Sequence, residues 1–221
     1  MTAARAVAVG AVIGVALVLV ALTLQAPAVP TYVPTAAQAR EAGPRLIGPI
    51  LYTVDASAPD VWRYFSFRLG SLVEAPGRHG WDLAFRRYSI VAGDGVGIRD
   101  LGEGRLEDVR TVPTTGYVAN DGRGEPRNPA IASWYRYGFF SHVLTPKPNV
   151  WAVRTADGRY AKLEMVGYYC PGGRPGCPTF RYVYQGDGST AVDAAAATAT
   201  PSLPLQRDAS IGHVVPTLPA R

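Results

Sequence analysis

The stretch from Leu46 to Gln185 consists of short segments rich in aromatic and β-branched residues, and glycine or proline separates one segment from the next. The whole chain holds 24 glycines and 19 prolines among 221 residues. Glycine and proline interrupt helices, whereas short apolar segments between turns are typical of strands. The sequence therefore predicts a mainly β domain over residues 46–185, built as an antiparallel sheet or sandwich.

Individual strands follow from the same pattern. We expect them at Ile47–Val54, Val61–Phe67, Trp81–Val91, Ala132–Phe139, Val150–Thr155, Tyr160–Tyr169 and Thr179–Tyr184. Asp157-Gly158, between the fifth and sixth of these, predicts a tight hairpin turn. At Ser57 a short helical turn is an alternative to extended chain, because Pro59 fits the first position of a helix.

The N-terminal region is apolar from Ala6 to Leu24, apart from Thr23. A helix of that length spans about 28 Å, close to the hydrocarbon thickness of a bilayer. The sequence thus predicts a single transmembrane anchor helix within residues 1–24. A cleaved signal is the alternative, because Ala26-Pro27-Ala28 and Ala37-Gln38-Ala39 both resemble processing sites.

Arg5 is the one charged residue before the apolar run. It predicts a cytoplasmic N-terminus, which gives a single-pass protein of a bacterial inner membrane with its main domain in the periplasm. Residues 25–45 are rich in proline and alanine and predict an extended linker. Residues 186–221, rich in alanine, threonine and proline, predict an irregular tail that cannot order itself alone.

Cys170 and Cys177 are the two cysteines of the chain, and prolines and glycines lie between and beside them. This spacing allows the chain to turn back on itself, as a short disulfide loop requires. A metal site needs more ligands than these two. We therefore predict a disulfide, which indicates an oxidising compartment.

Charge and composition argue against two classes of function. The net charge is +5, but the arginines alternate with acidic residues and form no basic patch, so nucleic-acid binding is not expected. No nucleophile motif or zinc motif occurs, and three histidines offer few general bases. The sequence predicts no enzyme and no catalytic residue.

Two further features have structural interpretations. Trp62, Trp81, Trp134 and Trp151 are expected in the core rather than around a ligand. Asp82 and Arg86 share one face of a predicted strand, and a structural ion pair between them is expected.

Several motifs resemble the HmuY-like family, over about residues 47–185. They are Tyr64-Phe65-Ser66-Phe67, Trp81-Asp82-Leu83-Ala84-Phe85-Arg86-Arg87-Tyr88, Trp134-Tyr135-Arg136-Tyr137, His142-Val143-Leu144-Thr145-Pro146, the hairpin Val153–Gly158 with Tyr160 and Lys162-Leu163, and Thr179-Phe180-Arg181-Tyr182. The resemblance implies an extracytoplasmic all-β fold. It also implies haem as a ligand, because the best-known members hold the iron between two axial histidines or methionines.

Candidate axial ligands are few in this sequence. The histidines are His79, His142 and His213, and the one methionine after Met1 is Met165. The pairing to test is His142 with Met165, or His142 with His79. The alternative interpretations are a partly exposed histidine bonded to backbone and a methionine that fills core volume.

Two functions remain open. The architecture favours a non-enzymatic extrinsic subunit, anchored through residues 6–24, whose periplasmic domain and tail bind and stabilise a membrane protein complex such as a respiratory or photosynthetic electron-transfer assembly. That hypothesis requires no cofactor. The alternative is an HmuY-like haem-binding protein tethered at the membrane.

Overall fold

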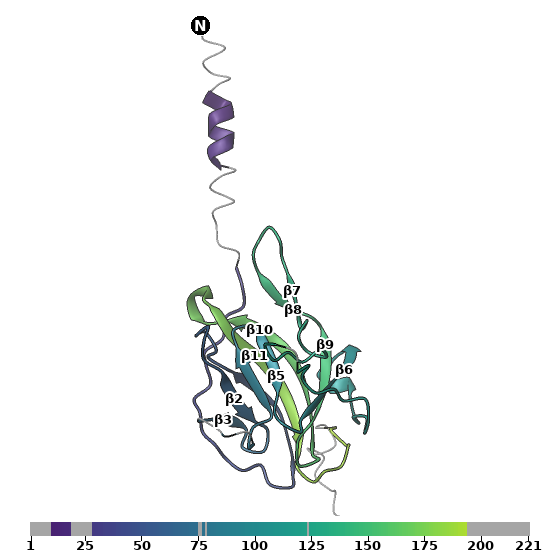
Figure 1. Ribbon diagram of the computed structural model, residues 1–221. Coiled ribbons are helices and arrows are strands. Elements are labelled where there is room, and N and C mark those ends of the chain that lie inside the picture. Colours follow the sequence, from purple (N-terminus) through teal and green to yellow (C-terminus); the bar gives the residue numbers. More distant parts are fainter. Residues whose placement is uncertain (1–9, 19–27, 75–76, 78, 123, 194–221) are drawn as a thin grey trace, which may run out of the picture.

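The computed structural model describes residues 10–18, 28–74, 77, 79–122 and 124–193 (Figure 1). Residues 10–18 form a helix. The rest of the predicted membrane helix over residues 6–24 lies outside the described residues, as does the predicted tail from residue 194 onward. Within the described ranges no helix is long and apolar enough to cross a membrane. The transmembrane helix therefore stays a prediction without support.

The β domain contains eleven strands and two short 3-10 helices. In chain order they are β1 (Leu46–Thr53), β2 (Arg63–Ser66), β3 (Ser71–Val73), β4 (Leu83–Arg86), β5 (Ser89–Ala92), β6 (Gly97–Glu103), η1 (Leu106–Asp108), β7 (Tyr135–Tyr137), β8 (Leu144–Pro146), β9 (Asn149–Arg154), β10 (Tyr160–Tyr169), η2 (Pro171–Gly173) and β11 (Pro175–Gln185). The prediction of a mainly β, antiparallel fold is confirmed.

The strands form three antiparallel sheets. The largest has the order β1-β11-β10-β9-β6, the second has the order β3-β2-β4-β5, and β7 pairs with β8 in a hairpin that stands apart (Figure 1). Strands β10 and β11 are the longest, and together they form the centre of the large sheet. Their connecting turn therefore extends beyond the rest of the sheet.

Aromatic rings fill the space between the two larger sheets. Phe180 on β11 stacks on Phe85 of β4 at 5.4 Å between ring centroids, and its edge meets Phe65 of β2 at 5.2 Å. All three side chains are almost fully buried. Burying rings of this size supplies a large share of the apolar stabilisation of such a domain.

Only two of the four tryptophans expected in the core are buried there. Trp134 and Trp151 are fully buried, as predicted. The edge of Trp81 meets Tyr64 at 5.0 Å, and Trp62 lies under the Arg86 guanidinium at 4.5 Å, both nearer the surface.

Some predicted elements differ from the structure. The single strand expected over Trp81–Val91 is the hairpin of β4 and β5, because Arg87 adopts a left-handed backbone with a φ of 54° and turns the chain. The helical turn considered at Ser57 does not form, since residues 54–58 have no regular secondary structure and Pro59 and Asp60 form a bend. The hairpin at Asp157-Gly158 is confirmed, and it joins β9 to β10.

The chain before β1 lies along the domain. Backbone hydrogen bonds attach it. The amide of Tyr32 donates to the carbonyl of Tyr169, and the amide of Thr35 donates to the carbonyl of Thr53. The amide of Ala42 donates to the carbonyl of Arg68. After β11, the chain stays attached as far as Val192, whose side chain is fully buried and whose amide donates to the carbonyl of Arg110. The segments on both sides of the strands are therefore packed on the domain wherever the structure describes them.

The predicted ion pair between Asp82 and Arg86 is wrong. Asp82 precedes β4, and its carboxylate accepts a hydrogen bond from the backbone amide of Phe67 at 2.7 Å. Arg86 instead pairs with Glu125. Burial raises the pKa of the Asp82 carboxyl to about 6, although the amide of Phe67 acts in the opposite direction.

Replacing Asp82 by asparagine tests this burial through the pH dependence of stability. A raised carboxyl pKa means that the folded protein binds the proton more tightly than the unfolded chain. The resulting stabilisation is present below about pH 4 and is lost as the pH rises through about 6. Denaturant unfolding should show wild type losing roughly 3 kcal/mol relative to Asp82→Asn between those conditions. If the difference in the free energy of unfolding between wild type and Asp82→Asn stayed constant over this pH range, the raised pKa of Asp82 would be contradicted.

The predicted disulfide is present. Cys170 and Cys177 are bonded and close the turn between β10 and β11. The turn carries η2, in which Gly172 and Gly173 have positive φ angles. Both cysteines are buried, so the bond joins the two strands where the hairpin leaves the core.

Removing the bond with Cys170→Ser and Cys177→Ser should lower the free energy of unfolding by about 2–3 kcal/mol, because a loop this short still restricts the unfolded chain. Thermal or denaturant unfolding measures the effect. A reducing agent should destabilise wild type to the same extent and leave the double variant unchanged. Equal sensitivity of both proteins to the reductant would contradict the expectation.

Candidate functional site

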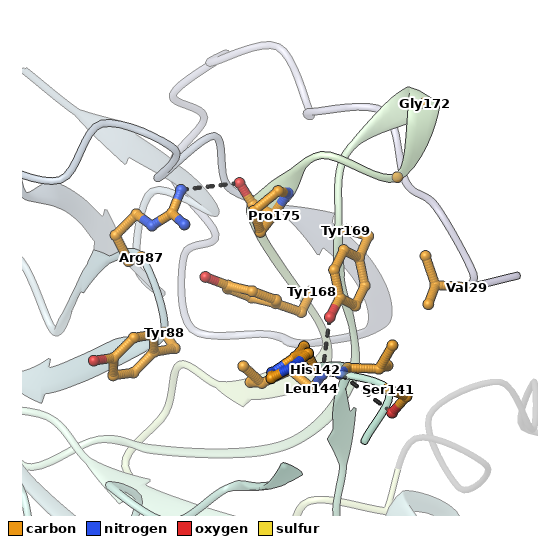
Figure 2. Close-up of a pocket in the computed structure, with 12 residues that line it drawn as sticks. Val29, Arg87, Tyr88, Ser141, His142, Leu144, Tyr168, Tyr169, Gly172 and Pro175 are labelled. Carbon is orange, nitrogen blue, oxygen red and sulfur yellow. Dashed lines mark hydrogen bonds between the residues drawn. The ribbon is translucent and has the colours of Figure 1, made fainter. Parts of the chain in front are cut away.

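A cavity of about 450 Å³ lies between the β7–β8 hairpin and the disulfide-closed turn of β10 and β11 (Figure 2). This volume is within the range of small-molecule sites. The lining residues are Val29, Arg87, Tyr88, Ser141, His142, Val143, Leu144, Tyr168, Tyr169, Gly172, Gly173 and Pro175. They come from four separate parts of the chain, and none of them is acidic.

The end of β10 forms one wall. Tyr168 and Tyr169 are consecutive, yet both line the cavity, because the register of β10 against β11 is irregular between Gly167 and Tyr169. Their rings meet edge to face, with centroids 5.3 Å apart and an interplanar angle of 75°. The glycines of η2 continue this wall without side chains. The wall therefore consists of two largely buried aromatic residues beside bare backbone.

The β7–β8 hairpin forms the facing wall. Its turn is closed by hydrogen bonds from the amide of Gly138 to the carbonyl of Val143 and from the amide of His142 to the carbonyl of Gly138, each 2.8 Å long. His142 has a φ of 53°, an unusual backbone for a histidine. His142 is exposed at the turn and contributes to the cavity wall (Figure 2).

The His142 ring is oriented by a neighbour. The Tyr137 hydroxyl lies 2.6 Å from Nδ1 of His142. When the imidazole is neutral and carries its proton on Nδ1, that proton is donated to the Tyr137 oxygen. The lone pair is then on Nε2, which is the arrangement a metal-binding histidine needs.

The two walls are joined directly. The backbone amide of Leu144 on β8 donates to the Tyr169 hydroxyl at 2.8 Å (Figure 2). On the other side of the same tyrosine, Thr31 forms a parallel bridge with Tyr169, which brings Val29 to the cavity. Tyr169 thus connects the hairpin, the large sheet and the N-terminal segment at one point.

Arg87 provides the positive charge. Its Nη1 donates to the carbonyls of Ser57 and Pro175, at 3.1 and 3.2 Å. Nε and Nη2 carry the remaining N–H donors of the guanidinium, which suit a carboxylate. Burial raises the pKa of the Tyr168 phenol, and the charge of Arg87 acts against that shift, so the Tyr168 hydroxyl is electrostatically coupled to Arg87.

The structure separates the two residues that the sequence nominated together. His142 lines the cavity. Met165 is 4% exposed, packs in the core and lies opposite Phe180 in the register of β10 and β11. It is not among the cavity residues. His79 is exposed and also outside the cavity, and His213 lies outside the described residues.

The cysteine sulfurs do not form a metal site. Asp55 lies near Cys170 and Cys177, in the one group of potential ligands found within the described part of the chain. Both sulfurs are used in the disulfide and cannot supply the thiolates that a metal would need.

Sequence analysis did not identify Arg87, Tyr168, Tyr169 or Val29 as site residues. The usable signal was the pair Tyr168-Tyr169 directly before Cys170, because a predicted disulfide turn fixes the residues that lead into it, although both side chains are buried in the structure. Arg87 gave no such signal. Its position at the cavity depends on the turn between β4 and β5, where the sequence pattern predicted one continuous strand.

The cavity has the features that a flat, largely apolar ligand with acidic groups requires. Apolar and aromatic side chains form its walls, Arg87 supplies a positive charge and His142 adds an imidazole. A ligand of this type is held mainly by apolar contact, and the few polar groups fix its orientation.

Known structures share this fold. The apo HmuY analogue of Tannerella forsythia aligns with a TM-score of 0.56 and 17% identity, over 66% of this chain and 99% of that one. A protein of Bacteroides fragilis assigned as a lipoprotein gives 0.54 and 19%, over 66% and 93%. A Bacteroides vulgatus protein assigned as HmuY-like and haem-binding gives 0.50 and 20%, over 61% and 91%. At these identities the likeness concerns the fold alone.

A comparison with curated proteins gives no match. The family model of the HmuY protein matches residues 58–182, which is more than half of the chain. This range runs from just before β2 almost to the end of β11 and includes both hairpins that border the cavity. The resemblance found in the sequence motifs is thereby confirmed, and the chain belongs to the HmuY family.

Proposed function

We propose that this protein binds haem in the cavity between the two hairpins, with Nε2 of His142 as an iron ligand. The observation that carries the proposal is the placement of His142: it lines the cavity from a turn with a left-handed backbone, and Tyr137 engages its Nδ1. The HmuY family and the haem-binding assignment of the Bacteroides vulgatus protein support the choice of ligand.

The residues of the cavity fit this ligand. A porphyrin offers two broad apolar faces, which match the exposed ring of Tyr88 and the partly exposed side chains of Val29, Val143 and Leu144. Its propionates are anionic, and Arg87 is the cation of the cavity. Because no acidic side chain lines the wall, nothing there repels a propionate.

Met165 is less suited than His142 to bind the iron. Haem iron accepts histidine, methionine or tyrosine as axial ligands. For Met165 to reach the iron it would have to leave a core position beside Phe180. The proposal therefore rests on His142, and a second ligand, if the iron takes one, would come from the tyrosine hydroxyls of the cavity.

The other function that the sequence suggested receives less support. A structural subunit of a membrane complex would be expected to resemble subunits of such assemblies, whereas the family and the structural neighbours indicate a haem-binding class. A binding protein of this kind is not an enzyme. The disulfide between Cys170 and Cys177 favours an extracytoplasmic location.

Titrating the full chain with haemin and following the Soret band tests the proposal. Wild type should shift the band at a one-to-one stoichiometry, and His142→Ala should weaken binding by about tenfold or more and change the position of the band, because an iron ligand is lost. His79→Ala is the matched control, since His79 is exposed and outside the cavity. No shift with wild type, or equal effects of both substitutions, would overturn the proposal.

Met165→Leu separates an axial role from a core role. Leucine keeps nearly the same volume, so a core methionine tolerates the exchange at a cost of under about 1.5 kcal/mol. We expect the Soret position and the haemin affinity to stay as in wild type, with only a small change in the unfolding midpoint. A changed band together with unchanged stability would mean that Met165 leaves the core to bind the iron.

A further inference from the structure

The apex of the β7–β8 hairpin exposes two consecutive phenylalanines. Phe139 is 77% exposed and Phe140 is 95% exposed. Their rings meet edge to face, with centroids 5.4 Å apart, and so form one apolar tip. Soluble surfaces seldom leave two adjacent rings in water, and such a patch indicates a contact with another apolar surface.

The tip is held in a defined turn. The carbonyl of Val143 and the carbonyl of Gly138 accept the two hydrogen bonds that close it, and the backbone of His142 completes the reversal. The strands below it are paired at Tyr135–Pro146, Arg136–Thr145 and Tyr137–Leu144. The hairpin projects from the domain (Figure 1), and its turn carries the two exposed rings.

The N-terminal segment reaches the domain at this same end. Val29 lines the cavity with His142, and the amide of Tyr32 donates to Tyr169. The sequence is apolar from Ala6 to Leu24. An extended chain covers about 3.5 Å per residue, so the apolar run ends within roughly 18 Å of Val29. If that run lies in a bilayer, the hairpin end of the domain lies at the membrane surface.

The charge of the hairpin suits such a surface. Residues 137–147 contain no acidic side chain, and Lys147 is a cation at the base of the hairpin. Aromatic side chains favour the interface between headgroups and acyl chains, and lysine favours anionic headgroups. A tip of this composition meets no electrostatic barrier at an anionic bilayer.

We propose that the β7–β8 hairpin places Phe139 and Phe140 in the interface of a lipid bilayer. The apolar tip thus contacts a membrane surface. Because His142 belongs to the same turn, the cavity then opens beside the lipid. Given the haem-binding function proposed above, on which this second step rests, an apolar ligand would enter and leave at the membrane, where it partitions.

Photocrosslinking tests the contact directly. The full chain carries benzoylphenylalanine at position 140 and is reconstituted in vesicles of phosphatidylethanolamine and phosphatidylglycerol. The matched control carries the same group at Ala156, an exposed residue of the turn at the other end of β10. We expect on the order of tenfold more lipid adducts from position 140, because the interface favours aromatic side chains.

Two results would overturn the proposal. Equal lipid adducts from positions 140 and 156 would show that the tip does not touch the bilayer. Adducts of position 140 with a protein, when the same variant is irradiated in native membranes, would identify the occupant as a polypeptide.

A double variant, Phe139→Ser with Phe140→Ser, distinguishes this proposal from haem binding. Both side chains are exposed, so the fold should be retained and haemin titration in detergent should match wild type. Transfer of haemin from preloaded vesicles should slow by roughly tenfold, since the tip no longer holds the cavity at the surface. Unchanged transfer would overturn the role in ligand entry. If wild type bound no haemin but position 140 still labelled lipid, only the haem function would fail.

Discussion

The packing of Phe180 against both Phe85 and Phe65 is the contact on which the rest of the structure depends. Phe180 lies on β11, at the centre of the large sheet, whereas Phe85 and Phe65 lie on the two central strands of the small sheet. This cluster fixes how the two sheets face each other. Since β11 pairs with both β1 and β10, its position also determines where those strands end. The turn between β10 and β11 is therefore carried to a defined place, one end of the sandwich, where it forms a wall of the cavity.

The cavity lies at the edge of the core. One wall is the β7–β8 hairpin, which belongs to neither large sheet, and the other is the disulfide-closed end of β10 and β11; the Leu144–Tyr169 hydrogen bond joins them. Tyr168 and Tyr169 are part of the buried core, and Val143 and Leu144 pack against it, so the core supports the cavity from below. The unusual backbone of His142, the positive φ angles of Gly172 and Gly173 and the irregular pairing of β10 with β11 all occur here. Backbone conformations of this kind concentrate at functional sites when surrounding structure determines them.

The sequence predicted the parts of the fold that depend on local pattern. Alternating aromatic and β-branched residues identified β1, β9, β10 and β11, and Asp157-Gly158 identified the turn between two of them. Strands β3, β6 and β8 were missed, because three-residue strands and the glycine-containing β6 carry little periodicity. The turn at Arg87 was missed since a left-handed arginine has no sequence signature. Of the site, His142 and the disulfide were found by residue type. Arg87, Tyr168 and Val29 were not, because only the tertiary arrangement of distant segments brings them together.

A core of this kind allows the fold to be retained at low sequence identity. The structural neighbours share 17–20% of their residues with this chain, yet align over most of their own lengths. A sandwich core tolerates exchange of one apolar side chain for another when total volume and pattern are kept. The two hairpins contribute to this core through Tyr168 and Tyr169 and through Val143 and Leu144, whereas the turn of the β7–β8 hairpin is exposed. An exposed residue such as His142 can therefore be exchanged in that turn without cost to the aromatic cluster. The position of the site would then be a property of the fold, and its ligand chemistry a property of the individual chain.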